Sequence, residues 1–179
     1  MTSRYNADGV GVNDRRQGFI SGRTGVPRRG VSAREERRSV PTALLSVHDK
    51  RGAADLARVL VEAGWRVLSS GGTAAHLADH GVPVVDVADL TGSGAILGHR
   101  VVTLHPAVHA GILADVDDPT HRADLERLGI EPIALVVVNL YPFAANPGVE
   151  LIDVGGPAMV RGAAKNHAHV AVVVDPADY

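Results

Sequence analysis

The strongest constraint on the fold is an alternation of short apolar segments with amphipathic ones. Residues 133–138 read Ile-Ala-Leu-Val-Val-Val, a continuous apolar run typical of a strand buried on both faces. Further strands are expected at residues 43–47, 65–68, 84–87 and 170–174. Strands that alternate with helices indicate a parallel sheet covered by helices on both faces. We therefore predict an α/β fold with three layers.

The helices between these strands are marked by periodicity and by glycine. Residues 52–63 carry apolar residues at helical spacing and stop before Gly64. Helices are also expected at residues 74–79, 119–128 and 155–164. In parallel sheets of this kind, ligands bind outside the carboxyl ends of the strands. The polar segments that follow the predicted strands are therefore the first place to look for a site.

Charge and composition divide the chain into two parts. Residues 1–38 hold nine arginines and four acidic residues without an apolar pattern, so we predict a disordered Arg-rich extension and a domain over residues 39–179. A basic arm that touches RNA or anionic lipid is the alternative for the extension. Residues 39–179 have a net charge of −7, which disfavours nucleic acid as a partner. The chain has no cysteine and no apolar run long enough for a bilayer, so we expect a cytoplasmic location and no membrane partner.

Two predicted turns have the chemistry of a phosphate site. Residues 69–73, Ser-Ser-Gly-Gly-Thr, lead from a strand into a helix, where free N–H groups and hydroxyls favour an anion. Ser46 and Lys50 follow the first strand and add a cation at the same edge. A plain turn with Thr73 as a helix cap is the alternative. The two turns together favour phosphate binding.

A second polar group lies near the C-terminus. The pair Gly155-Gly156 is surrounded, within the 29 residues from Asn139 to His167, by Tyr141, Asp153, Lys165 and His167. They supply donors, a carboxylate and a cation, which polar chemistry on a small charged molecule requires. Taken singly, each has a structural alternative: Asp153 as a helix cap, Lys165 at a helix end, and Tyr141 in the core. Their clustering with the phosphate turns favours a site.

The segment His105-Pro-Ala-Val-His109 has the spacing of a metal-binding pair. Pro106 disfavours a helix that holds both imidazoles together, unless it opens that helix, and no third ligand is evident. We therefore expect no metal. His105 or His109 as a hydrogen-bonding residue of the site is the alternative.

Nine ordered segments carry a family resemblance, which covers nearly all of the chain from residue 42. The chain resembles the N-terminal IMP cyclohydrolase domain of bifunctional purine biosynthesis proteins, which implies a methylglyoxal-synthase-like, Rossmann-like fold. The segments are Leu45-Ser-Val-His-Asp-Lys50, Ser70-Gly-Gly-Thr73, Asp89-Leu-Thr-Gly92, Arg100-Val-Val-Thr-Leu-His-Pro106, Val108-His-Ala-Gly-Ile-Leu113, Val138-Asn-Leu-Tyr-Pro-Phe143, Ile152-Asp-Val-Gly-Gly-Pro157, Arg161-Gly-Ala-Ala-Lys-Asn-His167 and Asp175-Pro-Ala-Asp-Tyr179.

The resemblance implies closure of the purine ring of 5-formamidoimidazole-4-carboxamide ribonucleotide to IMP, with loss of water and without a cofactor. It also implies a homodimer. By similarity, Tyr141, Asp153 and Lys165 carry the chemistry. The 5′-phosphate is held by Ser46, Lys50, Ser70, Gly71, Gly72 and Thr73, and the rest of the substrate is contacted by Arg100, Thr103, Asn139 and Gly155.

Four departures from the family pattern keep alternatives open. Val102 stands where the family has a lysine at the reacting carbonyl, and a lost donor there commonly lowers the rate roughly 10²–10³-fold. His48 and Arg51 replace Ser and Thr in the phosphate turn. The segment at residues 93–96 differs, and the stretch before Asp153 is short. The match stops at Tyr179, so we expect a truncated domain end and no transformylase activity. The alternatives are a nucleotide-phosphate-binding module with impaired catalysis and a paralogue that cyclises a purine analogue.

Overall fold

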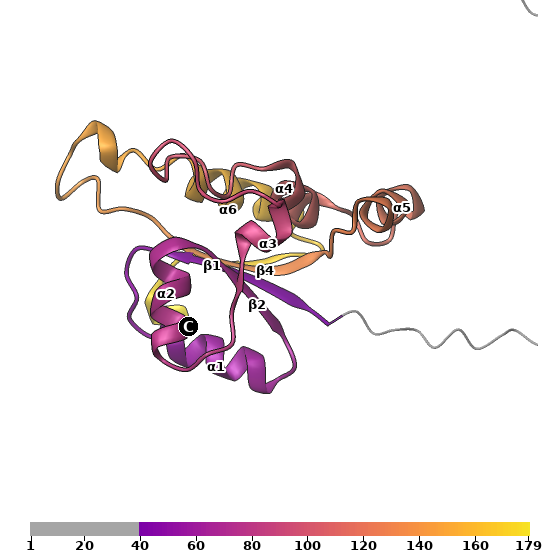
Figure 1. Ribbon diagram of the computed structural model, residues 1–179, viewed down its shortest axis with the longest axis horizontal. Coiled ribbons are helices and arrows are strands. Elements are labelled where there is room, and N and C mark those ends of the chain that lie inside the picture. Colours follow the sequence, from indigo (N-terminus) through magenta and orange to yellow (C-terminus); the bar gives the residue numbers. More distant parts are fainter. Residues whose placement is uncertain (1–39) are drawn as a thin grey trace, which may run out of the picture. The chain divides into compact units, whose positions relative to one another are not determined.

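Five strands form one parallel sheet in the computed structural model, which describes residues 40–179 (Figure 1). The predicted extension over residues 1–38 and the predicted domain start at residue 39 lie outside the described residues. The sheet confirms the expected α/β class. The strand order is β3-β2-β1-β4-β5, with β1 at Thr42–Val47, β2 at Arg66–Ser69, β3 at Val85–Asp86, β4 at Ile133–Asn139 and β5 at Ala171–Val173.

The order of the strands places a topological switch beside β1. The chain builds β1, β2 and β3 outward in one direction, and then returns to add β4 on the other side of β1. Val47 at the end of β1 lies in register with Asn139 at the end of β4. Loops that leave these two strands therefore diverge from a common point, where ligands of open parallel sheets bind.

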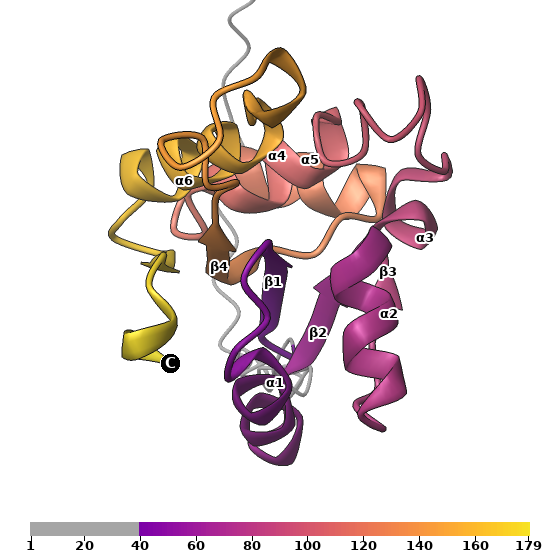
Figure 2. The same ribbon diagram turned by 90° about the vertical axis from the view of Figure 1, so that its left-hand side faces the viewer.

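Helices α1 (Ala53–Glu62) and α2 (Gly71–Asp79) cover one face of the sheet (Figure 2). Alternate residues of β1, namely Ala43, Leu45 and Val47, point to this face because side chains of a strand alternate between faces. They pack against fully buried residues of the two helices. This first core comprises Ala43, Leu45, Val47, Ala53, Ala54, Ala57, Leu60, Val67, Leu77, Val82 and Val137.

Helices α4 (Pro106–Leu113) and α6 (Gly155–Lys165) pack on the other face. The two helices approach each other closely, since a Cβ atom added at Gly162 would lie 3.1 Å from the Ile112 side chain. The second core comprises Leu44, Leu68, Val87, Val108, Ile112, Ile133, Val136, Val138, Met159, Ala163 and Val170. The two faces confirm the predicted three-layer arrangement.

Two helices of this second layer were not predicted. Helix α3 (Val87–Thr91) takes over residues expected in a strand, because the Asp86 side chain accepts the Ala88 N–H at 2.8 Å and starts a helix. Helix α4 is apolar on most sides and so gives no amphipathic pattern. The remaining elements are α5 (Pro119–Leu128) and the short 3₁₀ helices at Val149–Leu151 and Pro176–Asp178. Among residues 40–179, no helix has the length and apolar character needed to cross a membrane.

Candidate functional site

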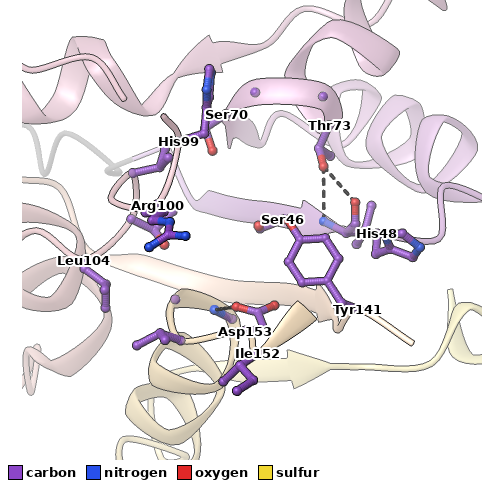
Figure 3. Close-up of a pocket in the computed structure, with 18 of the residues that line it drawn as sticks. Ser46, His48, Ser70, Thr73, His99, Arg100, Leu104, Tyr141, Ile152 and Asp153 are labelled. Carbon is purple, nitrogen blue, oxygen red and sulfur yellow. Dashed lines mark hydrogen bonds between the residues drawn. The ribbon is translucent and has the colours of Figure 1, made fainter. Parts of the chain in front are cut away.

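A cavity of about 670 Å³ opens at the carboxyl edge of the sheet (Figure 3). Its walls come from the ends of β1, β2 and β4, from the loop at residues 98–104, and from residues 149–156, which lead into the first turn of α6. The structure therefore gathers side chains from five separate segments around one space. The predicted site residues that line it are Ser46, Lys50, Ser70, Gly71, Gly72, Thr73, Arg100, Thr103, Asn139, Tyr141, Asp153 and Gly155, which is the whole predicted set except Lys165.

The N-terminus of α2 forms one end of this cavity. The helix begins at Gly71, three residues before the predicted start, so the glycine segment is its first turn. Ser70 is the N-cap residue, but its side chain makes no capping hydrogen bond. Gly71 has a φ of +52°, which favours glycine. The first N–H groups of a helix lack intrahelical partners, so this end presents donors and a positive dipole to an anion.

Lys50 and Thr73 connect this helix end to β1. The Lys50 Nζ donates to the Val47 carbonyl at 2.5 Å and lies 3.4 Å from Thr73 Oγ1. Thr73 Oγ1 in turn donates to the same carbonyl at 3.0 Å and accepts the Val47 N–H at 3.2 Å. Burial lowers the pKa of Lys50 below its ordinary value. Burial disfavours the charged form of Lys50, and an anion bound here would stabilise that charged form.

Asn139 lines the cavity, but its amide is already fully used by the chain. Its Oδ1 accepts the N–H groups of His48 and Asp49, both at 2.7 Å. Its Nδ2 donates to the Asp49 carbonyl at 2.9 Å and to the Tyr179 hydroxyl at 3.1 Å. Two acceptor and two donor positions exhaust an amide. Asn139 therefore fixes the loop after β1, and this geometry leaves no amide hydrogen bond for a nucleotide.

Tyr141 stands at the other side of the cavity, two residues beyond β4. The residue is 45% exposed, and its ring meets the His48 ring edge-on, with centroids 5.2 Å apart and planes at 66°. In Figure 3 the Tyr141 ring lies between Ser46 and Asp153. His48 and Tyr141 meet because the ends of β1 and β4 are paired. The sequence singled out His48 only as a departure from the family and did not predict this contact.

Asp153 precedes α6 and is fixed by it. Its Oδ1 accepts the Gly156 N–H at 2.8 Å, so the carboxylate is both a helix cap and a wall of the cavity. A Cβ atom at Gly156 would lie 2.6 Å from Asp153 Oδ2, and one at Gly155 would lie 2.8 Å from Thr103 Oγ1. The two glycines are thus required by close contacts with site residues. The N-cap position itself is Val154, so Asp153 accepts this hydrogen bond from one residue before the cap, and its functional role stays a prediction.

The loop at residues 98–104 adds groups that the sequence left undecided. His99 and Arg100 both line the cavity, and so does Val102, which offers neither charge nor a donor. The Arg100 Nη2 donates to the Glu150 carboxylate on the opposite loop. Glu150 was not predicted as a site residue, because nothing in the sequence shows that these two loops meet.

Lys165 lies apart from the other members of the predicted cluster. It is the last residue of α6, whereas Gly155 at the first position of α6 lines the cavity. Ten residues of helix separate them by about 15 Å. Lys165 is exposed and does not line the cavity. Its neighbour Asn166 donates to the carbonyls of Ile112 and Ala114, both at 2.9 Å, so this segment fixes the end of α4.

The two histidines of the HxxxH segment also lie outside the cavity wall. Pro106 opens α4, and His105 is its N-cap, with Nδ1 accepting the Ala107 N–H at 3.1 Å. His109 is half-buried, and burial lowers the pKa of its imidazole. In the described part of the chain, one group brings metal-ligand atoms within 4.8 Å of one another: Asp115, Asp117 and His169. It does not line the cavity.

Comparisons with known proteins identify the family of this chain. The family model described as "MGS-like domain" matches residues 52–157. The bifunctional purine biosynthesis protein PurH of Synechococcus sp. (strain CC9311) is 58% identical over 149 residues, which cover 78% of this chain and 28% of that protein. The protein of the same name from Synechococcus sp. (strain WH7803) is 57% identical with the same coverage. The chain thus spans about a quarter of the length of these relatives.

The fold of this chain is also similar to that of a solved structure. The structure titled "Crystal structure of ForH" matches with a TM-score of 0.70 and 44% sequence identity. The match covers 79% of this chain and 76% of that chain. At this identity, the likeness extends beyond general topology to the sequence of the domain.

Proposed function

Because its residues 52–157 match the family model, this chain belongs to the family of MGS-like domains, and we propose that it is an IMP cyclohydrolase of purine biosynthesis. The observation that carries the proposal is the composition of the 670 Å³ cavity at the carboxyl edge. One end presents a helix N-terminus with Lys50, and the other presents Asp153 and Tyr141. A ribonucleotide has the same polarity, with a phosphate at one end and a base at the other. The similarity to PurH supports the substrate class.

The proposed reaction is an intramolecular condensation. The carboxamide nitrogen of 5-formamidoimidazole-4-carboxamide ribonucleotide attacks the formyl carbon, a C–N bond forms, and the formyl oxygen leaves as water. The step involves no net oxidation or reduction. It requires that the two reacting groups be held together, that charge on the formyl oxygen be stabilised, and that protons move from nitrogen to oxygen.

The cavity has residues suited to each requirement. The first N–H groups of α2 and Lys50 would hold the 5′-phosphate, which fixes the base at the far end. Asp153 would accept a proton from the attacking nitrogen, and the Tyr141 hydroxyl would donate to the developing oxyanion. Asp153 is suited to this role because α6 fixes its orientation through the Gly156 N–H. The resemblance alone implies a role for Lys165, and the position of this residue does not support it.

The test is turnover, measured as the ultraviolet absorbance change when 5-formamidoimidazole-4-carboxamide ribonucleotide becomes IMP. We expect the unmodified chain to convert the substrate above an enzyme-free control. Asp153→Asn keeps the shape of the side chain and is expected to lower kcat roughly 10²–10³-fold. Asp124→Asn, which removes an exposed carboxylate on α5, is the matched control and should leave kcat unchanged. Equal turnover by all three proteins would contradict the assignment of Asp153.

A second candidate function is favoured by Val102. A half-buried valine in the cavity wall provides no donor at the reacting end, which suits a module that binds a nucleotide without turnover. The Val102→Lys variant discriminates the two functions. Turnover by the variant alone, with IMP bound by both proteins in calorimetry, would support the binding module. Turnover by the unmodified chain would exclude it.

A further inference from the structure

The turn at residues 97–100 holds the rim of the cavity in an uncommon backbone conformation. Ile96 and Val101 form an antiparallel bridge, with hydrogen bonds of 3.0 and 3.3 Å. Between them, Leu97, Gly98 and His99 all have positive φ, at 53°, 62° and 70°. This region is unfavourable for residues with a Cβ atom, although histidine occupies it more often than most. Such conformations persist where the surroundings fix them, commonly beside functional sites.

The two non-glycine residues of the turn differ in what they face. His99 lines the cavity, whereas Leu97 is 71% exposed and does not line it. In the view of Figure 3, His99 lies on the side of Ser70, away from Tyr141 and Asp153. Ser70 is the N-cap residue of α2. The turn therefore presents an imidazole toward the end of the cavity that has anion-binding character.

The other basic side chains of the cavity wall are already engaged. Lys50 donates to the Val47 carbonyl, and Arg100 pairs with Glu150. The ring of His48 packs against Tyr141. Within residues 40–179, two basic rings of the wall, His48 and His99, make no hydrogen bond to another residue. Of the two, His99 is the one that lies beside Ser70 in Figure 3, so its ring is available to a ligand at that end of the cavity.

From these observations we infer that His99 is a further substrate-binding residue, which donates a hydrogen bond to the anionic end of the nucleotide. The inference rests on the proposed function and deepens it. An imidazole donor beside a helix N-terminus adds a side-chain contact to the backbone N–H groups that already favour an anion there. Such a contact would give a reason for a histidine at position 99, where the positive φ favours glycine.

The test compares His99→Gly with the matched control Leu97→Gly. Both variants place glycine at a positive φ in the same turn, where glycine suits the backbone but adds freedom to the unfolded chain. The first effect stabilises the folded chain and the second destabilises it, to a similar extent in both variants. We therefore expect both melting temperatures to remain within a few degrees of that of the unmodified chain. His99→Asn, which also tolerates positive φ, repeats the test if the glycine variant fails to fold.

Calorimetry with IMP, ribose 5-phosphate and inosine separates the outcomes. We expect His99→Gly to weaken IMP and ribose 5-phosphate roughly tenfold or more, with inosine unaffected, while Leu97→Gly binds all three like the unmodified chain. Unchanged affinity of His99→Gly for IMP would overturn the inference alone, and so would an equal loss for inosine and IMP. If the unmodified chain binds neither phosphate compound, the proposed function fails together with the inference.

Discussion

At the scale of single residues, two asparagine side chains join segments that are distant in the sequence, and one of them, Asn139, lies in the cavity wall. Asn139 joins the end of β4 to the loop after β1 through hydrogen bonds to His48 and Asp49. Asn166 joins the end of α6 to the end of α4. Both belong to segments that the sequence connected with chemistry. Their contacts show that part of the family pattern is explained by folding.

Asn139→Ala is expected to lower the free energy of unfolding by about 2 kcal/mol. The substitution leaves the N–H groups of His48 and Asp49 without their side-chain acceptor, and each unpaired group carries a desolvation cost. Asn146→Ala, in the exposed loop after Tyr141, is the control and should change stability by less than about 0.5 kcal/mol. Urea unfolding measures both. Equal stability of the two variants would contradict the structural role of Asn139.

The lowered pKa of Asp49 leads to a prediction about the stability of the folded chain at acidic pH. Hydrogen bonds from the Arg51 side chain and backbone N–H lower the pKa of this carboxyl from 3.8 to about 2. The unfolded chain therefore binds a proton at a higher pH than the folded chain does. The stabilisation is present above pH 3.8 and is lost as pH falls through about 2. We expect the difference in unfolding midpoint between the unmodified chain and Asp49→Asn to shrink from pH 4 to pH 2. If the unfolding midpoints of the two proteins instead changed in parallel over this range, the Asp49–Arg51 pair would not be a source of the pH dependence.

At the scale of elements, strands and capped helices were predictable because their signals are local. The apolar run at residues 133–138 and helix α5 (Pro119–Leu128), which Gly129 terminates, were predictable without knowledge of distant contacts. Helix α4 was missed because His109 is its only polar side chain, and a helix that is apolar on nearly all sides has no distinguishing period. Strand β3 was predicted too long because the Asp86 cap starts α3 within it.

The close packing of Gly156 in the first turn of α6 leads to a prediction about the start of this helix. Gly156→Ala would place a Cβ atom 2.6 Å from Asp153 Oδ2 and 2.7 Å from Leu140 Cδ2. We expect a loss of about 1–3 kcal/mol in unfolding free energy and lower turnover, because Asp153 must move. Alanine in an open helix position would instead stabilise.

Gly148→Ala is the control for this element, because a Cβ atom there meets nothing within 4 Å. It should leave turnover and stability nearly unchanged. The denaturant midpoint and kcat of both variants decide the result. A Gly156→Ala protein as active as the Gly148→Ala protein would show that the position of Asp153 does not limit the reaction.

The candidate site was predictable in its residues but not in its contacts. Twelve of the thirteen predicted site residues line the cavity, because motifs that follow parallel strands converge at one edge. The pairing of Arg100 with Glu150 depends on how two loops fold toward each other, which periodicity does not report. Lys165 lies away from the cavity because it is at the C-terminal end of the eleven-residue helix α6, whereas the cavity is at the N-terminal end.

At the scale of the whole molecule, the cavity depends on both sides of the sheet. The α2 end comes from the half built by β1 and β2, and Tyr141 and Asp153 come from the half built by β4 and α6. The contact between β1 and β4 joins these halves. We therefore expect nucleotide binding to be lost wherever this strand pair is disrupted.

Removal of residues 1–38 tests the predicted domain boundary. The sequence of this segment has no periodic apolar pattern and predicts no part of the fold. A chain that begins at residue 39 is expected to keep the melting temperature and the affinity for IMP of the full chain. Thermal unfolding and calorimetry measure both quantities. A fall in either one would show that the extension contributes to the domain.

The most direct test of the account is a crystal structure of the chain with IMP bound. We expect the phosphate within about 3 Å of the first N–H groups of α2, at Gly71 and Gly72, and the purine ring beside Asp153 and Tyr141. A nucleotide bound in the reverse direction, or outside the cavity at the carboxyl edge, would contradict the account.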